Sequence, residues 1–454
     1  MQPRARAITI RNAFRCALVA LALQACGDTS RAPQTAAEAY IWGYPLVVTI
    51  RTLQTFASLI PVNQLTWQTA LSGPDSRLVV APNRDTLYAV APMDLRGEPY
   101  ALTVPEIGDR YYAFEMIGAY TDVFAYVGTR ATGGRAGTWV ITPPGWSGTL
   151  PAGAARLESP TPQFFLLGRF LVDGDADVAN VLALRGQVRL EPLSRLTGTA
   201  PAPAPPPPGT PAGTPQDIVS AGVHFFDELG DDLAIDPPSD PAQQTILGRY
   251  VSLGVGPGRH PSAEQTDPAV QAALAAGVVD GDRMIAQASN SPGGEVDGWR
   301  VNPHLGRYGD DALLRAVTAR IGWGANVAEE AIYALSQHDA DGAAYTGTRR
   351  YVLHFPPGGL PPVEAFWSLT LYGPDRFFVA NSIGRYAIGD RTPGLTTNPD
   401  GSLDIYLQHD PPTGHESNWL PAPEGAFLLI LRLYLPRPEV IDGRYAYPPV
   451  RAVS

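Results

Sequence analysis

The chain has 454 residues, of which 44% are hydrophobic and 17% charged, so neither a disordered chain nor a membrane-embedded bundle describes the whole. Its 33 basic residues are all arginine, which excludes a Schiff-base lysine and a Gly-Lys-Ser/Thr phosphate loop. The net charge of −11 argues against nucleic acid as a partner, and the length predicts two or three domains. Glycine and proline, at 46 residues each, predict many turns and short strands.

Residues 1–25 have the composition of a signal peptide. Four arginines precede the apolar run Cys16–Leu23, which is too short to span a bilayer. The following Leu23-Gln24-Ala25-Cys26 resembles the lipobox of bacterial lipoproteins, in which Cys26 carries the lipid; a plain secretory signal cut after Ala25 is the alternative. Both predict export, and Gly27 favours the outer membrane, on its periplasmic side or surface. Cleavage removes four arginines and no acid, which takes the net charge from −11 to −15.

The mature chain begins with a predicted helical segment over residues 26–58, which Pro45 is expected to kink or end. Residues 59–196 hold short apolar runs separated by glycine and proline, which is typical of an antiparallel β-sandwich. The proline-rich stretch 197–215 is predicted to be a linker with polyproline II character.

A helical segment is predicted for residues 216–341. Apolar stripes mark 217–229 and Pro268–Ser289, and a further helix begins near Asp310 and is expected to resume, after a glycine break, over Glu329–Gln337. Strands return over residues 342–454, including the apolar run 377–382, and predict a jelly-roll sandwich. The fold class is therefore mainly β with a helical middle.

Five segments resemble a tandem pair of exported bacterial domains, the domains of unknown function 1254 and 1214. The segments are Glu38–Pro45, Pro82–Tyr88, Phe366–Tyr372, Ile383–Arg391 and Asn418–Pro423. The resemblance covers nearly all of the mature chain. It implies an immunoglobulin-like N-terminal sandwich and a C-terminal jelly roll, and it implies no settled activity.

Two loops carry candidate ligand-binding residues. These are Asn83, Arg84, Asp85 and Tyr88 in the first β-domain, and Arg385, Tyr386, Arg391 and Trp419 in the second. A loop arginine can bind an anion bidentately while a neighbouring aspartate orients it. The alternative for the first loop is an Asx turn at Asn83 with a local Arg84–Asp85 pair. If the two β-domains face one another, the loops are expected to line a shared cleft.

A catalytic carboxylate pair is the enzymatic hypothesis. Asp390, Asp404, Asp410 and Glu416 lie in the second β-domain near aromatic residues that could stack on sugar rings, and glycosidic bond cleavage needs one acid and one base or nucleophile. Surface acids are equally expected in so acidic a chain. The stretch His409–Glu416 contains metal-ligand residue types without a recognised metal spacing, so we expect neither a metal nor a cofactor.

These observations predict an exported envelope protein that binds a polar ligand such as a glycan and, as a carboxylate-dependent hydrolase, would cleave it. A non-catalytic binding protein and a structural lipoprotein are the alternatives. Contact with the membrane is expected through the lipid alone, and self-association is left open.

Overall fold

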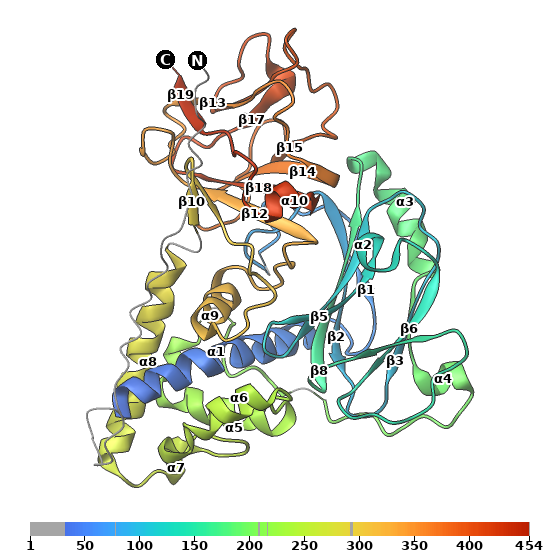
Figure 1. Ribbon diagram of the computed structural model, residues 1–454, viewed down its shortest axis with the longest axis vertical. Helices are drawn as coiled ribbons and strands as arrows, with labels where there is room; N and C mark the ends of the chain where they lie inside the picture. The colour runs from blue at the N-terminus through green and yellow to red at the C-terminus, as the bar shows by residue number, and fades with distance from the viewer. Residues whose placement is uncertain (1–31, 78, 208, 216, 291–293, 454) are drawn as a thin grey trace, which may run out of the picture.

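The computed structural model describes residues 32–77, 79–207, 209–215, 217–290 and 294–453. The predicted signal peptide and the lipidation site Cys26 lie outside these residues. Two β-sandwiches and a group of helices make up the described chain. In Figure 1 the N-terminal sandwich lies at the right, the C-terminal one at the top and the helices at the lower left. Within the described residues, no helix is both long and apolar enough to cross a membrane.

Helix α1 (Ala32–Ala57) runs through the centre of the helical group and is buried along most of its length. It continues past Pro45, so of the two outcomes expected there, a kink or an end, the structure rules out the end. Helix α8 presents glycines to the part of α1 that precedes Pro45. A Cβ on Gly277 would lie 2.5 Å from the Cβ of Ala36, and one on Gly281 would lie 2.6 Å from Cδ1 of Tyr40. The two helices can therefore approach closely along their length.

The N-terminal sandwich consists of two sheets. The first has the order β1-β2-β8-β4-β5, with bounds Thr66–Trp67, Thr86–Asp94, Gln163–Leu171, Tyr112–Gly118 and Val123–Gly128. The second has the order β7-β6-β3-β9, with bounds Ala155–Glu158, Gly137–Thr142, Tyr100–Val104 and Arg189–Pro192. Phe114, Phe164 and Phe170 fill the space between the sheets. Short helices α2 (Thr129–Thr132) and α3 (Val178–Leu182) connect strands, and α4 (Leu193–Thr197) follows β9.

The helices of the middle segment pack around α1. They are α5 (Phe225–Ile235), α6 (Pro241–Gly248), α7 (Pro261–Glu264), α8 (Pro268–Ser289) and α9 (Ala312–Ile321). The bounds of α8 are those expected from its apolar stripe, and Asp311 caps α9 by accepting a hydrogen bond from Leu314 N. The proline-rich stretch is held against α1, because Arg51 Nη1 donates to the carbonyl oxygens of Thr214 and Asp217.

The C-terminal sandwich also has two sheets. One has the order β10-β11-β12-β18-β14-β15, with bounds Gly294–Val296, Trp299–Val301, Ala331–Ser336, Leu428–Pro436, Val363–Tyr372 and Ala387–Gly389. The other has the order β17-β16-β13-β19, with bounds Trp419–Pro421, Leu403–Gln408, Arg350–Phe355 and Val450–Val453. The short helix α10 (Pro438–Ile441) follows β18. The mainly β fold with a helical middle is confirmed.

Two local expectations are wrong. The helix expected over Glu329–Gln337 is strand β12, which is buried on both faces, and an apolar run of this kind has no periodicity to separate strand from helix. The run 377–382 is not a strand. Its apolar character serves packing instead, because the ring of Phe378 stacks on Tyr372 with a centroid separation of 5.0 Å.

The two sandwiches meet through the outer faces of their larger sheets. Tyr111, just before β4, packs against Phe366 of β14 and Tyr434 of β18 with centroid separations of 5.6 and 5.4 Å. The rings of Phe366 and Tyr434 stack at 4.3 Å. Each large sheet thus has one face in its own sandwich core and the other against a neighbour, which brings side chains of both domains together.

Candidate functional site

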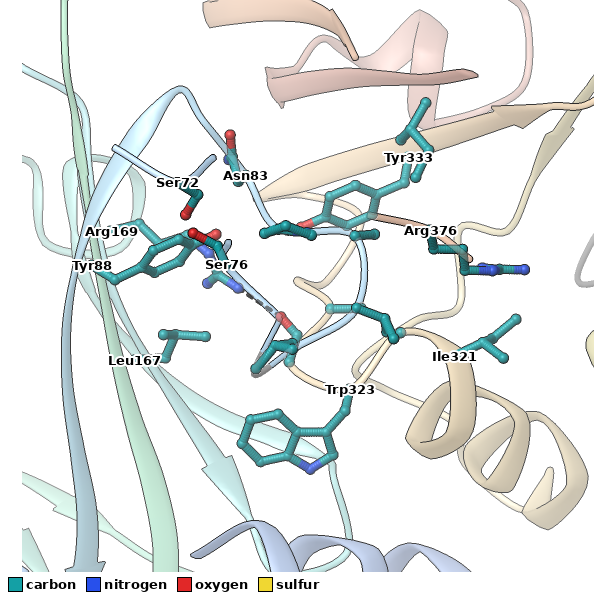
Figure 2. A pocket seen from close by; sticks show the side chains of 18 of the residues that line it. Ser72, Ser76, Asn83, Tyr88, Leu167, Arg169, Ile321, Trp323, Tyr333 and Arg376 are labelled. Carbon is teal, nitrogen blue, oxygen red and sulfur yellow. Dashed lines mark hydrogen bonds between the residues drawn. The ribbon is translucent and has the colours of Figure 1, made fainter. Parts of the chain in front are cut away.

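A cavity of about 500 Å³ lies between the two large sheets. Its walls come from β2 and β8 of the first sandwich, β12 and β18 of the second, helix α9 and the segment between β1 and β2. Figure 2 shows Tyr88, Leu167 and Arg169 on one side of the cavity, Ile321, Tyr333 and Arg376 on the other, and Trp323 below them. The volume falls within the range of roughly 300 to 1,000 Å³ that is common for small-molecule sites.

Strand alternation places the polar groups of the cavity. In β8 the side chains of Phe164, Leu166 and Phe170 point into the sandwich core, so Leu167 and Arg169 point to the opposite face. The same alternation in β18 turns Leu431 and Leu433 into the core and Arg432 and Tyr434 toward the cavity. Two arginines therefore stand in the middle of otherwise apolar strands.

Arg169 is the centre of a buried polar network. Its Nη1 donates to Glu115 Oε2 and, at 3.1 Å, to Asn326 Oδ1, and its Nη2 donates to the Gly324 carbonyl at 2.6 Å. Tyr126 completes the network, because its hydroxyl lies 3.2 Å from Asn326 Oδ1. Burial raises the pKa of Glu115, and the Arg169 charge opposes this rise. The network ties the loop that follows α9 to the first sandwich.

A second buried carboxylate, Glu330, joins the domains beside this network. It accepts hydrogen bonds from the Tyr111 hydroxyl at 2.9 Å and from Arg130 Nε at 2.7 Å. Burial raises the pKa of Glu330, while the Arg130 hydrogen bond lowers it. Both partners come from the first sandwich, and Glu330 directly precedes β12 of the second. This contact therefore fixes the position of one large sheet relative to the other beside the cavity.

Arg432 forms the opposite corner of the cavity, and all its hydrogen bonds are to neutral groups. Nη1 donates to Thr370 Oγ1 at 2.8 Å, and Nη2 donates to the Ala81 carbonyl at 2.9 Å and to the Tyr372 hydroxyl at 2.7 Å. Ala81 N in turn donates to the Arg376 carbonyl. Ala81 and Arg376 have φ of 51° and 65°, so this corner contains two residues in the left-handed region. Backbone strain of this kind clusters at functional sites.

Tyrosine hydroxyls supply further donors to the cavity. The Tyr434 hydroxyl accepts from Asn83 Nδ2 at 2.6 Å, and the Tyr333 hydroxyl accepts from Asn326 Nδ2 at 2.7 Å. The orientation of each amide is settled by its oxygen, which accepts from another donor. Burial raises the pKa of Tyr333 and of Tyr434, so both keep their protons. Neither proton has an acceptor among the described residues, and both are available to a ligand.

The two loops singled out in the sequence meet at the domain interface. Asp85 Oδ1 lies 3.0 Å from Arg391 Nη2, and Asp85 Oδ2 accepts a hydrogen bond from Ser368 Oγ at 2.5 Å. The guanidinium of Arg84 lies over the ring of Tyr386, 5.3 Å from its centroid. These contacts join the domains and leave Asp85 and Arg391 paired with one another.

The Asx turn considered for Asn83 is present, because its side-chain oxygen accepts from Asp85 N. The local Arg84–Asp85 pair is absent from the described contacts; Arg84 pairs instead with Asp175 at 3.4 Å. Of the eight candidate ligand residues, Asn83 and Tyr88 line the cavity.

Arg385 and Trp419 have local structural contacts. Arg385 Nη1 donates to the carbonyl oxygens of Glu416, Ser417 and Trp419 and so fixes the turn before β17. Trp419 is buried and its indole nitrogen donates to the Gln408 carbonyl. Its ring is therefore covered, and it presents no open face for stacking on a sugar.

The four candidate catalytic carboxylates are dispersed. Asp404 lies 2.6 Å from His354 Nδ1, Asp410 lies 2.9 Å from His409 Nδ1, and Glu416 accepts from Gly414 N. Burial raises the pKa of Asp390 to about 6 beside Arg391. None of the four lines the cavity, and no hydrogen bond among the described residues joins any two of them. The described residues contain no group of three or more His, Cys, Asp or Glu able to hold a metal.

Reasoning from motifs missed Glu115, Arg169 and Arg432. All three carry a signal in the printed sequence, since a charged residue interrupts a strand that is otherwise apolar. A charge at such a position is costly to bury unless it is paired or hydrogen-bonded, and therefore marks a special environment. Recognising the environment required knowing that the outer faces of both sheets are covered.

Two family models and one solved structure agree with this architecture. The model described as protein of unknown function DUF1254 matches residues 62–192, and that described as protein of unknown function DUF1214 matches residues 330–438. A protein of Vibrio parahaemolyticus with a known crystal structure is similar in fold, with a TM-score of 0.73 and 23% identity over 93% of this chain and 100% of its own. An uncharacterised protein from Burkholderia cenocepacia gives a TM-score of 0.46 and 15% identity over 94% of each chain.

No curated protein matches the chain. The two family models match in the order expected from the sequence, one on each sandwich. The chain therefore belongs to the proteins that carry the DUF1254 and DUF1214 domains in tandem.

Proposed function

We propose that this protein binds a small organic molecule in the cavity between its two sandwiches. The observation that carries the proposal is the composition of the wall. Apolar side chains such as Leu167, Ile321 and Trp323 form most of it, and a few polar groups converge on the space from both domains. An apolar wall with a small number of fixed donors is the usual construction of a small-molecule site.

The wall favours a ligand with an apolar body over a free glycan. A sugar needs a hydrogen-bond partner for most of its hydroxyl groups, because burying an unpaired hydroxyl costs free energy. Binding in this cavity also has more support than hydrolysis by a carboxylate pair, since Asp390, Asp404, Asp410 and Glu416 all lie outside the wall.

A cavity-filling variant tests the proposal. Leu167→Trp replaces an aliphatic side chain with a bulkier indole in the space between β8 and the loop after α9. Leu196→Trp makes the same exchange at an exposed position on α4. The probe is the neutral fluorophore phenylnaphthylamine, whose emission rises in an apolar site. We expect saturable binding at one site per chain in the unaltered protein and in Leu196→Trp, and at least tenfold weaker binding in Leu167→Trp.

Circular dichroism of each variant controls for folding. Absence of saturable binding, or equal binding by the two variants in folded form, would refute the proposal.

We also propose that the protein is exported and anchored by a lipid on Cys26. The support is the sequence before Cys26, with its arginines, short apolar run and small Ala25. A binding protein held at the envelope would meet ligands that enter the periplasm.

A further inference from the structure

The charge around the cavity is opposite in sign to that of the whole protein. Five arginines line it, namely Arg77, Arg169, Arg300, Arg376 and Arg432. Among the described residues, the lining contains one carboxylate, Asp75, which is exposed. The chain as a whole has 44 acidic residues against 33 arginines, so this local excess of arginine departs from the composition.

Three of these arginines are neutralised by carboxylates outside the lining. Arg77 pairs with Asp375 and Arg300 pairs with Glu295, while Arg169 pairs with Glu115. Their charges are therefore largely satisfied before a ligand arrives.

Arg376 and Arg432 have no carboxylate partner among the described residues. Arg432 is 3% exposed and uses three of its five N–H groups on neutral acceptors, which leaves two. Asp85 is the carboxylate whose charge acts on Arg432, and both of its oxygens already accept hydrogen bonds from other side chains. The Arg376 side chain has no hydrogen-bond partner in the described chain, and burial lowers its pKa. Arg432 is therefore a buried cation without a counter-ion, which is costly, and Arg376 is a half-buried one. An anionic ligand would remove that cost.

The proton-bearing hydroxyl groups of Tyr333 and Tyr434 point to the same ligand chemistry. Tyr434 follows Arg432 on the same face of β18, and Tyr333 lies directly opposite Arg432 in β12. Hydroxyl donors beside a guanidinium favour an acceptor-rich group such as a carboxylate. Leu314, Val317 and Ile321 of α9 line another part of the wall and provide an apolar surface.

We propose that the ligand is an amphiphilic organic anion, whose carboxylate is held by Arg432 and Arg376 and whose apolar body lies along α9. This inference rests on the proposed function, since it assigns a ligand class to the same cavity. At this corner Arg432 Nη2 donates to the Ala81 carbonyl and Ala81 N donates to the Arg376 carbonyl, so the Arg432 guanidinium is held in place and the backbone of Arg376 lies next to it.

Three probes with one tail and different head groups test it, namely decanoate, decanol and decyltrimethylammonium, with calorimetry on the full chain. We expect decanoate to bind at least tenfold more tightly than decanol, and the cation to bind most weakly. Arg376→Gln is the principal variant, because its side chain makes no hydrogen bond that the fold needs; Arg432→Gln is the second. Either should weaken decanoate about tenfold, the loss expected for one charge-assisted hydrogen bond, and should leave decanol unchanged.

The control is Arg350→Gln, which removes the same charge from an exposed position at the start of β13, outside the cavity. It should bind decanoate as the unaltered protein does. Equal binding of decanoate and decanol, tighter binding of the cation, or an unchanged decanoate affinity in Arg376→Gln would each overturn the anion inference while leaving the cavity as a binding site. Failure of all three probes to bind would overturn the anion inference together with the proposed function.

Discussion

Asp236 allows a test of how burial of a carboxyl group makes the stability of this fold depend on pH. The residue follows the last turn of α5, is fully buried, and accepts a hydrogen bond from Gln163 N at Oδ1, while its Oδ2 has no partner. Burial raises the pKa of Asp236 to about 8. A negative charge at a helix C-terminus is disfavoured further by the helix dipole. The native protein therefore holds a proton on Asp236 that the unfolded chain loses near its ordinary pKa of about 3.9.

The sign of the pH dependence follows from this difference. Between about pH 4 and pH 8 the native state binds the proton more tightly than the unfolded state, so the free energy of unfolding falls as pH rises. Each unit of pKa difference corresponds to about 1.4 kcal/mol, which sets an upper limit of about 6 kcal/mol across this interval. The stabilisation is complete below about pH 4 and is lost above about pH 8.

The variant Asp236→Asn keeps the acceptor for Gln163 and removes the titration. We expect urea unfolding to show a smaller fall in stability from pH 5 to pH 8 in the variant, and the variant to be the more stable protein at pH 8.5. Asp109→Asn, at an exposed turn position without a hydrogen-bond partner in the described chain, controls for the change in net charge. If Asp236→Asn and the unaltered protein lose stability in parallel as pH rises, burial does not set the protonation of Asp236.

Three further outcomes are expected. Glu115→Gln should lower the unfolding free energy by about 3 to 5 kcal/mol, because it leaves Arg169 buried without its carboxylate partner. Adding Arg169→Met should recover part of that loss in urea titrations. No recovery would argue against the ion pair as the cause. Arg385→Met should cost about 1 to 2 kcal/mol in the same assay, because the two hydrogens of Nη1 are shared among three carbonyl oxygens, and it should not alter cavity binding. Altered binding would contradict its placement outside the cavity. Cys26→Ser should abolish labelling by an alkyne-modified palmitate in cells, and a labelled variant would exclude Cys26 as the lipid site.

The sequence pointed to one edge of the candidate site, at Asn83 and Tyr88, but not to its centre. The loops at Asn83–Tyr88 and Arg385–Arg391 were singled out by composition, and the structure brings them together through Asp85 and Arg391. Their contact mainly connects the two domains, and the cavity lies beside it. A loop with arginine and aspartate side by side has the same local appearance whether it binds a ligand or a second domain, so residue type alone could not separate these roles.

Local chemistry determined what the sequence predicted correctly. The apolar stripe and Pro268 fixed the bounds of α8, Asp311 marked the start of α9, and alternating apolar runs indicated two sandwiches. These features depend on neighbours within a few residues, which the sequence displays directly.

Only the tertiary structure decided which faces of those elements are covered. Arg432 and Arg169 stand on outer sheet faces that would meet solvent in an isolated sandwich, and they are buried because the second domain packs there. Tyr434 illustrates the distance involved, since it bonds to Asn83 across 351 residues of chain. The alternation of residues along a strand shows that the two faces of the strand differ. It does not show what packs on the outer face, because that is set by contacts between segments remote in sequence. Those contacts create the cavity.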